Sequence, residues 1–227
     1  MGCECMIKKP KRITLFAGHY GSGKTNIAVN FALRLKEMGK EVEIADLDIV
    51  NPYYRTKDSE KELNAAGIKV ISSEFANSNV DFPAMPGEAY SIIDNKDVFA
   101  VCDVGGDDRG AYALGRFREG IMAEDYEMYL VINKYRPLTS DVDSLAEIKE
   151  EIEAAAGIPF TAIVNNSNLG RETTAEAVLD SLAYANEASL RLGLPIKLTT
   201  VYEPVYEELK DKIENLMPLV LQQRNFW

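Results

Sequence analysis

The stretch of sequence that decides the fold is ITLFAGHYGSGKT, residues 13–25. Its first five residues are apolar or β-branched, which is typical of a buried strand, and the rest fits the pattern G-x-x-x-x-G-K-[ST]. Residues 25–38 follow with Phe31 and Leu35 at helical spacing, and Gly39 ends the pattern. A glycine-rich turn between a strand and a helix directs backbone N–H groups inward at the positive helix end. The sequence therefore predicts a phosphate-binding loop.

The remainder of the chain repeats the alternation of strand and helix. Further strands are predicted at 41–48, 68–72, 98–103, 127–133, 160–165 and 196–202. Helices are predicted at 57–66, 109–123, 141–156, 173–192 and 204–217. This order predicts an α/β fold with a mainly parallel seven-stranded sheet and helices on both faces, as in P-loop NTPases. We expect one domain over residues 1–227, with a mobile N-terminus at 1–11, because no linker or repeat divides the chain.

Composition narrows the possible functions. The 227 residues include 36 acidic and 25 basic side chains, so the net charge is −11, which disfavours a protein that coats nucleic acid. No apolar run approaches the roughly 20 residues of a membrane helix, and the N-terminus lacks the apolar core of a signal peptide. We therefore expect a cytoplasmic protein with no direct nucleic-acid or membrane partner.

The three cysteines do not suit a disulfide framework. Cys102 lies in the apolar run VFAVC and is expected to be buried. Cys3 and Cys5 have two interpretations: incidental thiols near the N-terminus, or half of a soft-metal site completed by a second subunit.

The phosphate loop supplies most of the candidate site. Lys24 is expected to reach the β- and γ-phosphates as a catalytic cation, and the Thr25 hydroxyl to bind Mg²⁺. The predicted nucleotide contacts in the loop are Gly18, His19, Tyr20, Gly21, Ser22, Gly23, Lys24, Thr25 and Asn26.

Two acidic segments follow predicted strands, where ligands bind in open α/β sheets. The first, ADLDIVNPYYR, contains Asp46 and Asp48, whose spacing of two places them on one side of a strand. The second, VCDVGGDDRG, contains Asp103, a candidate for the Mg²⁺ shell, and Gly106, whose N–H can face a γ-phosphate. Each aspartate alone also fits a solvated strand end.

With these three segments in order, the chain resembles the ParA/MinD and CobQ/CobB class of P-loop nucleotide-binding proteins over nearly its whole length. The resemblance implies that Asp48 positions the attacking water and belongs to the metal site, with Asp46 supporting it and Asp103 holding the metal. Members that form ATP-sandwich dimers carry a lysine directly after the first glycine, where this chain has His19. A homodimer is therefore possible, but the cross-subunit lysine is absent.

The base is predicted from two asparagine-containing segments. NKYR, residues 133–136, resembles a guanine-reading N-K-x-D, but Arg136 has no acceptor for guanine N–H groups, which disfavours GTP. In the resembling ATPases an asparagine after a late strand contacts adenine, and Asn165 and Asn166 occupy such a place. The alternative is that they only shape a turn. We expect ATP and Mg²⁺ as cofactors.

Three functions fit these features. The first is an ATP-binding, slowly hydrolysing ATPase that acts as a switch on a protein client through its nucleotide-dependent loops. The second is an ATP-dependent phosphotransferase or ligase, with Arg109, Arg116 and Arg118 clamping a small acidic substrate under the loop at 75–88. The third is a nucleotide-binding interaction module that has lost turnover.

Overall fold

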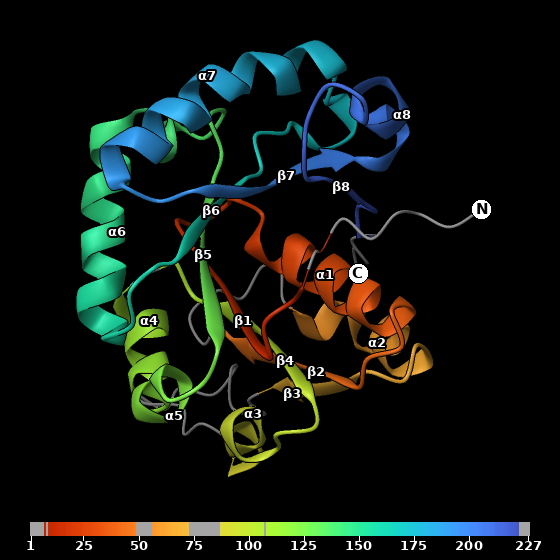
Figure 1. Cartoon of the computed structure of the whole chain (residues 1–227), viewed down its shortest axis with the longest axis vertical. Helices are drawn as coiled ribbons and strands as arrows, with labels where there is room; N and C mark the ends of the chain where they lie inside the picture. Colours follow the sequence, from red (N-terminus) through yellow and green to blue (C-terminus); the bar gives the residue numbers. More distant parts are fainter. Residues whose placement is uncertain (1–6, 8, 49–55, 73–86, 107, 223–227) are drawn as a thin grey trace.

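The computed structural model shows an α/β fold, one β-sheet with flanking helices (Figure 1). It describes residues 7, 9–48, 56–72, 87–106 and 108–222. The eight strands have the order β3-β2-β4-β1-β5-β6-β7-β8, and every neighbouring pair is parallel. They are β1 (Ile13–Ala17), β2 (Val42–Leu47), β3 (Lys69–Ser72), β4 (Phe99–Val104), β5 (Tyr126–Ile132), β6 (Ala162–Asn165), β7 (Ile196–Tyr202) and β8 (Leu216–Leu219). The predicted α/β class is confirmed, with eight strands in place of the predicted seven.

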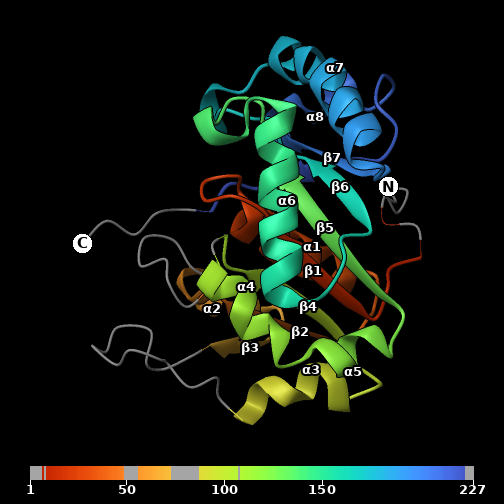
Figure 2. The same ribbon diagram turned by 90° about the vertical axis from the view of Figure 1, so that its left-hand side faces the viewer.

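Helices cover both faces of the sheet, because each strand except β8 is followed by a helical crossover to the next parallel strand. They are α1 (Lys24–Glu37), α2 (Glu60–Ala65), α3 (Ser91–Asp94), α4 (Asp108–Gly115), α5 (Arg118–Met122), α6 (Val142–Ala156), α7 (Ala175–Leu192) and α8 (Tyr206–Leu209). Figure 2 shows α6 in front of the sheet with α1 behind it. The helix predicted at 109–123 is divided into α4 and α5.

Alternation along β1 explains why this strand contributes to the two larger hydrophobic clusters, one on each face of the sheet. Leu15 joins the cluster that contains α4 and α6, whereas Phe16 joins the cluster that contains α1. Phe16 packs edge-on against Phe31 of α1 and stacks on Tyr129 of β5, with ring centroids 5.3 Å apart in both pairs. Because β1 is buried on both faces, the loop that follows it begins from a fixed position.

The prediction of a helix over 204–217 is wrong. The α-helix there covers only Tyr206–Leu209, and Asn215 takes a left-handed conformation with φ of 55° that leads the chain into β8. Pro218 lies in β8, which is tolerated because an edge strand has one unpaired side. Asn30 of α1 holds the end of this strand, donating to Val220 O at 3.0 Å and accepting from Val220 N at 2.9 Å.

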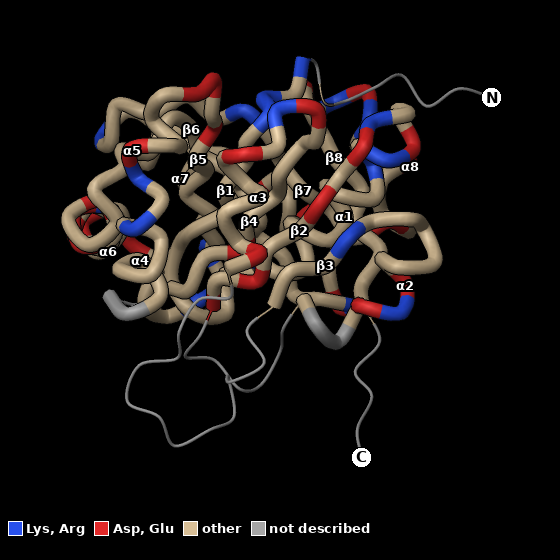
Figure 3. Tube along the Cα trace, turned by 90° about the horizontal axis from the view of Figure 1, so that it is seen from below, with Lys and Arg blue, Asp and Glu red and all other residues tan. Residues whose placement is uncertain are grey.

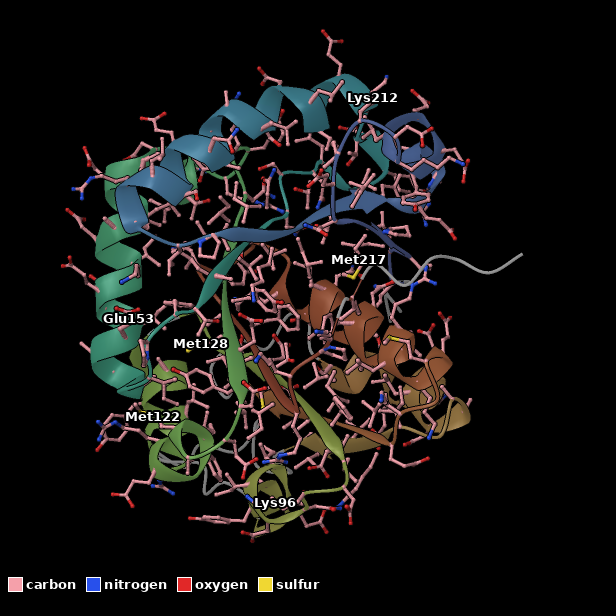
Figure 4. All side chains as sticks on the ribbon, viewed as in Figure 1. Lys96, Met122, Met128, Glu153, Lys212 and Met217 are labelled. Carbon is pink, nitrogen blue, oxygen red and sulfur yellow. The ribbon has the colours of Figure 1, made fainter. Side chains whose placement is uncertain are left out.

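Surface and interior are clearly separated. Met128 and Met217 lie inside and are fully buried, whereas Lys96 and Lys212 lie at the periphery (Figure 4). In the view of Figure 3, acidic and basic residues are interspersed and do not form one large basic patch. Cys102 is buried and free, as predicted. Within the part of the chain that the structure describes, no helix is both long and apolar enough to cross a bilayer.

Candidate functional site: a phosphate loop between two flanks

The loop between β1 and α1 has the shape of a phosphate cradle. Gly18 and Gly23 have φ values of 144° and 93°, a region that side chains other than glycine rarely adopt. A Cβ on Gly18 would lie 2.5 Å from the Val131 carbonyl oxygen, so β5 leaves no space for one. Gly23 precedes α1 and offers no side-chain cap. The first N–H groups of the helix are thus presented to a ligand.

The polar side chains of this loop are mostly buried. Lys24 and Thr25 expose 6% and 9% of their surface, and Lys24 Nζ donates to His19 O at a long 3.4 Å. Ser22 is fully buried, and its hydroxyl has no hydrogen-bond partner in the described part of the chain. Buried polar groups normally have partners, so this loop is arranged for a ligand with acceptor atoms.

Two acidic strand ends meet beside the loop. Asp46 of β2 is the register partner of Asp103 of β4, because the two strands are parallel neighbours. Asp46 Oδ1 accepts from the Asp48 backbone N–H at 3.1 Å, which fixes the turn after β2. Asp48 faces Gly105, where a Cβ would lie 3.2 Å from Asp48 Oδ1. The structure therefore places the three predicted carboxylates at one end of the sheet.

Asp103 is the most unusual of these groups. Burial raises the pKa of Asp103 to about 6, and Asp48 adds to this; Lys24 and hydrogen bonds from Thr25 and Thr56 act in the opposite direction. Its Oδ2 accepts from the Thr56 hydroxyl at 3.2 Å. Its Oδ1 is buried and has no hydrogen-bond partner among the described residues. A hard cation with oxygen ligands suits this oxygen and the nearby Thr25 hydroxyl.

Thr56 was not predicted from the sequence. It is fully buried and donates to Asp103, although 47 residues separate the two in the chain. The available signal was a hydroxyl residue shortly after the acidic strand end at Asp48. In the described residues no group of three or more His, Cys, Asp or Glu side chains is arranged to hold a metal. A cation here would thus complete its shell with water and phosphate oxygens, as Mg²⁺ commonly does.

Gly106 approaches the phosphate loop from the β4 side. A Cβ on Gly106 would lie 2.5 Å from Gly18 O and 2.9 Å from Tyr20 N. Only glycine permits this contact between the segment after β4 and the loop after β1. Gly106 thus lies against the phosphate loop, and its contact with a γ-phosphate stays a prediction.

The side of the loop nearer β6 is built from amides. Asn166 Nδ2 donates to Ser22 O at 2.5 Å, and Asn166 Oδ1 accepts from the Thr200 hydroxyl at 2.5 Å. Asn165 Nδ2 donates to Ser181 Oγ at 3.0 Å, and its Oδ1 accepts from the Ser167 hydroxyl at 2.6 Å. Both asparagines thus brace the protein itself. Their contact with a base stays a prediction.

The side chains of NKYR, residues 133–136, contact the protein itself and the phosphate loop. Asn133 Oδ1 accepts from Tyr135 N at 2.9 Å, and Lys134 Nζ pairs with Asp180 Oδ2 at 2.5 Å. Arg136 lies against the phosphate loop: a Cβ on Gly21 would be 3.5 Å from Arg136 Nε. Its guanidinium therefore lies beside Gly21 of the phosphate loop.

Other predicted residues have simpler surroundings. His19 Nδ1 lies 3.0 Å from Tyr20 O, and Tyr20 is 57% exposed. Asn26 Oδ1 accepts from Gln222 N at 3.3 Å. Arg118, considered for an acidic substrate, donates to Gly157 O at 2.8 Å and so supports the end of α6. Cys3, Cys5, residues 75–86 and the Arg109 side chain lie outside the described residues.

Solved structures share this fold. The chain is similar to the signal recognition particle 54 kDa protein of Aeropyrum pernix in complex with GDP, with 18% identity, a TM-score of 0.54, and coverage of 86% of this chain and 43% of that one. It is similar to the cell division protein FtsY of Thermotoga maritima (21%, 0.55, 86% and 63%) and FtsY of Mycoplasma mycoides (18%, 0.56, 86% and 62%). The chain thus spans less than two thirds of each. No protein-family model and no curated protein sequence matches it.

These neighbours define the class, a P-loop nucleotide-binding fold, and correct the family. The assignment to the ParA/MinD and CobQ/CobB class is wrong, since the neighbours are the signal recognition particle 54 kDa protein and FtsY. The reason is physical: a phosphate loop and aspartates at strand ends are what any P-loop fold needs to hold phosphate and Mg²⁺. Such motifs determine the fold and leave the family open.

Proposed function

We propose that this protein is a Mg²⁺-dependent nucleoside triphosphatase that works as a switch on a protein client. One observation carries the proposal: the buried, unpartnered Oδ1 of Asp103 lies in a site with Lys24 and Thr25. A carboxylate oxygen buried in this way is costly unless a ligand satisfies it. A cation bound to a triphosphate in the adjoining loop would do so.

Each residue has a role that its position supports. The N–H groups at the start of α1 and the Lys24 ammonium bind the phosphate oxygens. Thr25 and Asp103 hold Mg²⁺, which would neutralise charge on the β- and γ-phosphates. Asp48, fixed by its backbone bond to Asp46, orients the attacking water. Gly106, packed on Gly18, senses whether a γ-phosphate is present.

We propose that the bound nucleotide carries a purine base, which is either guanine or adenine. The objection to GTP was that Arg136 replaces the aspartate of N-K-x-D, but Arg136 lies beside Gly21 in the phosphate loop. The neighbour that holds GDP favours guanine. The two asparagines after β6 favoured adenine, yet their amides bind Ser22 and Ser181. Titration with fluorescent analogues of both triphosphates decides between them.

A protein client is supported by exposed apolar side chains near the loop. Tyr20 of the loop, Tyr112 of α4, Leu138 after β5 and Leu169 after β6 are 57%, 65%, 60% and 47% exposed. All four follow the carboxyl ends of strands, where the phosphate loop also lies. Side chains of this kind at a nucleotide-sensitive edge suit a partner whose contact depends on the bound nucleotide.

Phosphate release and nucleotide binding test the proposal together. Lys24→Ala should weaken triphosphate binding at least about 100-fold, because it removes a buried charge from the phosphates. Asp48→Asn should bind normally and release phosphate about 100-fold more slowly. Lys61→Ala, an exposed lysine on α2, is the matched control. Failure of the wild type to bind either triphosphate overturns the proposal, and unchanged release by Asp48→Asn removes Asp48 from it.

A further inference from the structure

The backbone around Arg136 is held firmly in place. After β5, Arg136 N donates to Asn133 O at 3.1 Å, and Thr139 N donates to Arg136 O at 3.0 Å. The buried Thr139 hydroxyl donates to Asn133 O at 2.8 Å, and Tyr184 of α7 donates its hydroxyl to Thr139 O. The turn is therefore fixed to the sheet on one side and to α7 on the other, and it presents Arg136 from a rigid support.

The guanidinium is placed at the phosphate loop. Measured from the position of a Cβ on Gly21, Arg136 Nε is 3.5 Å away and Cζ is 3.6 Å away. In the sheet, β4 and β5 lie on opposite sides of β1. The loop therefore has Gly106 on its β4 side and Arg136 on its β5 side. An anion in the loop would lie between Mg²⁺ ligands on one side and this guanidinium on the other.

Arg136 has no counter-ion of its own in the part of the chain that the structure describes. Neither a hydrogen bond nor an ion pair involves its side chain there, although Lys134, two residues earlier, pairs with Asp180. The chain carries 36 acidic residues against 25 basic ones, so an unpaired arginine is not explained by a shortage of carboxylates. A planar guanidinium with five donors suits phosphate oxygens in a bidentate contact.

We propose that Arg136 is a second phosphate-binding cation, which contacts the nucleotide's phosphate chain from the β5 side while Lys24 contacts it from within the loop. The inference rests on the proposed function and adds a residue to that site. Because Arg136 addresses phosphate, its contribution is the same for every base. The proposal gives the segment NKYR a role in phosphate binding. The motif alone suggested a guanine-binding N-K-x-D sequence that lacks its aspartate.

Affinity for three probes tests this assignment: a non-hydrolysable ATP analogue, the matching GTP analogue and inorganic tripolyphosphate. Arg136→Ala should weaken all three by a similar factor of about 10 to 100, the usual effect of losing a charge-assisted contact. Arg136→Lys should fall between, because an ammonium keeps the charge and loses the bidentate geometry. Arg34→Ala is the control, because Arg34 lies about 15 Å along α1 from Lys24. There it pairs with Glu37.

Arg136→Asp is the sharpest variant, because it creates the sequence N-K-x-D. We expect this variant to bind all three probes more weakly than Arg136→Ala does, because the new carboxylate repels phosphate. A gain of preference for the GTP analogue, or a loss in Arg136→Ala confined to one base, would overturn the proposal. So would unchanged tripolyphosphate affinity in Arg136→Ala while the wild type binds.

Two readouts separate the possible failures. The wild-type affinities test the proposed function itself, so an Arg136 variant that equals a binding wild type refutes only the role of Arg136. Thermal unfolding without nucleotide tests folding, and it should be unchanged in Arg136→Ala because the side chain is exposed and without partners among the described residues. A variant that loses stability and binding together would assign Arg136 a structural role and overturn the proposal.

Discussion

The phosphate loop lies between two flanks of opposite chemistry. The acidic flank, Asp48, Asp103, Gly105 and Gly106, is charged, and it keeps one buried carboxylate oxygen without a partner among the described residues. The amide flank, Asn165, Asn166, Ser167 and Thr200, is neutral, and its side chains hydrogen-bond one another and the loop. The polar side chains of both flanks are almost completely buried.

The difference between the flanks indicates that one binds the ligand and the other holds the loop in shape. A buried group without a partner costs free energy in the empty protein, and a ligand that satisfies it recovers that cost. The acidic flank is therefore arranged to bind. The amide flank, whose groups are satisfied, holds the loop in shape before any ligand arrives. Variants in the two flanks should accordingly fail in different ways.

The largest effect is expected in the acidic flank. Asp103→Asn removes the charge that would hold Mg²⁺ and should lower phosphate release about 100- to 1,000-fold. The substitution is nearly isosteric and removes a buried charge, so nucleotide-free stability should be equal or higher. Steady-state hydrolysis and thermal unfolding measure the two effects. Normal hydrolysis in this variant would remove Asp103 from the metal site.

The amide flank should lose stability in addition to binding. Asn166→Ala removes the partner of Ser22 O and of the Thr200 hydroxyl, both buried, at a cost of about 2–3 kcal/mol in the free energy of unfolding. Denaturant unfolding without nucleotide measures it. Asn64→Ala, an exposed asparagine on α2, is the control and should change stability by less than about 0.5 kcal/mol. Equal losses in the two variants would contradict the bracing role.

The smallest effect is a pH dependence confined to the acidic flank. Burial raises the pKa of Asp103 to about 6, above its ordinary 3.8, so the folded protein holds this proton more tightly than the unfolded chain does. The contribution of Asp103 to stability is therefore greatest below pH 3.8, and it falls as the pH rises to about 6. The slope is at most about 1.4 kcal/mol per pH unit.

Unfolding in the presence of a chelator tests this dependence. The stability of Asp103→Asn relative to the wild type should grow between about pH 4 and pH 6 and stay constant above. Asn166→Ala, which keeps Asp103, should follow the wild-type profile at lower stability. Parallel profiles for the wild type and Asp103→Asn would show that Asp103 titrates normally.

Much of the acidic flank was predictable from local sequence. Asp46, Asp48 and Asp103 each end an apolar run, and parallel strands bring their carboxyl ends to one edge of a sheet. The amide flank was not predictable in its role, because Asn166 acts on Ser22, 144 residues away. The place of Arg136 beside the phosphate loop was not predictable either, because it depends on β5 lying next to β1. The eighth strand was missed because a four-residue apolar run does not distinguish a strand from a helix.

The sequence by itself determined the α/β class and the phosphate loop, because strand and helix periods and the glycine pattern are local properties of the chain. It also determined which carboxylates end strands. Only the tertiary structure decided the strand order, and with it which side chains meet at the loop: Thr56 on Asp103, Asn166 on Ser22 and Arg136 beside Gly21. These contacts join residues far apart in the chain, and no local period records them.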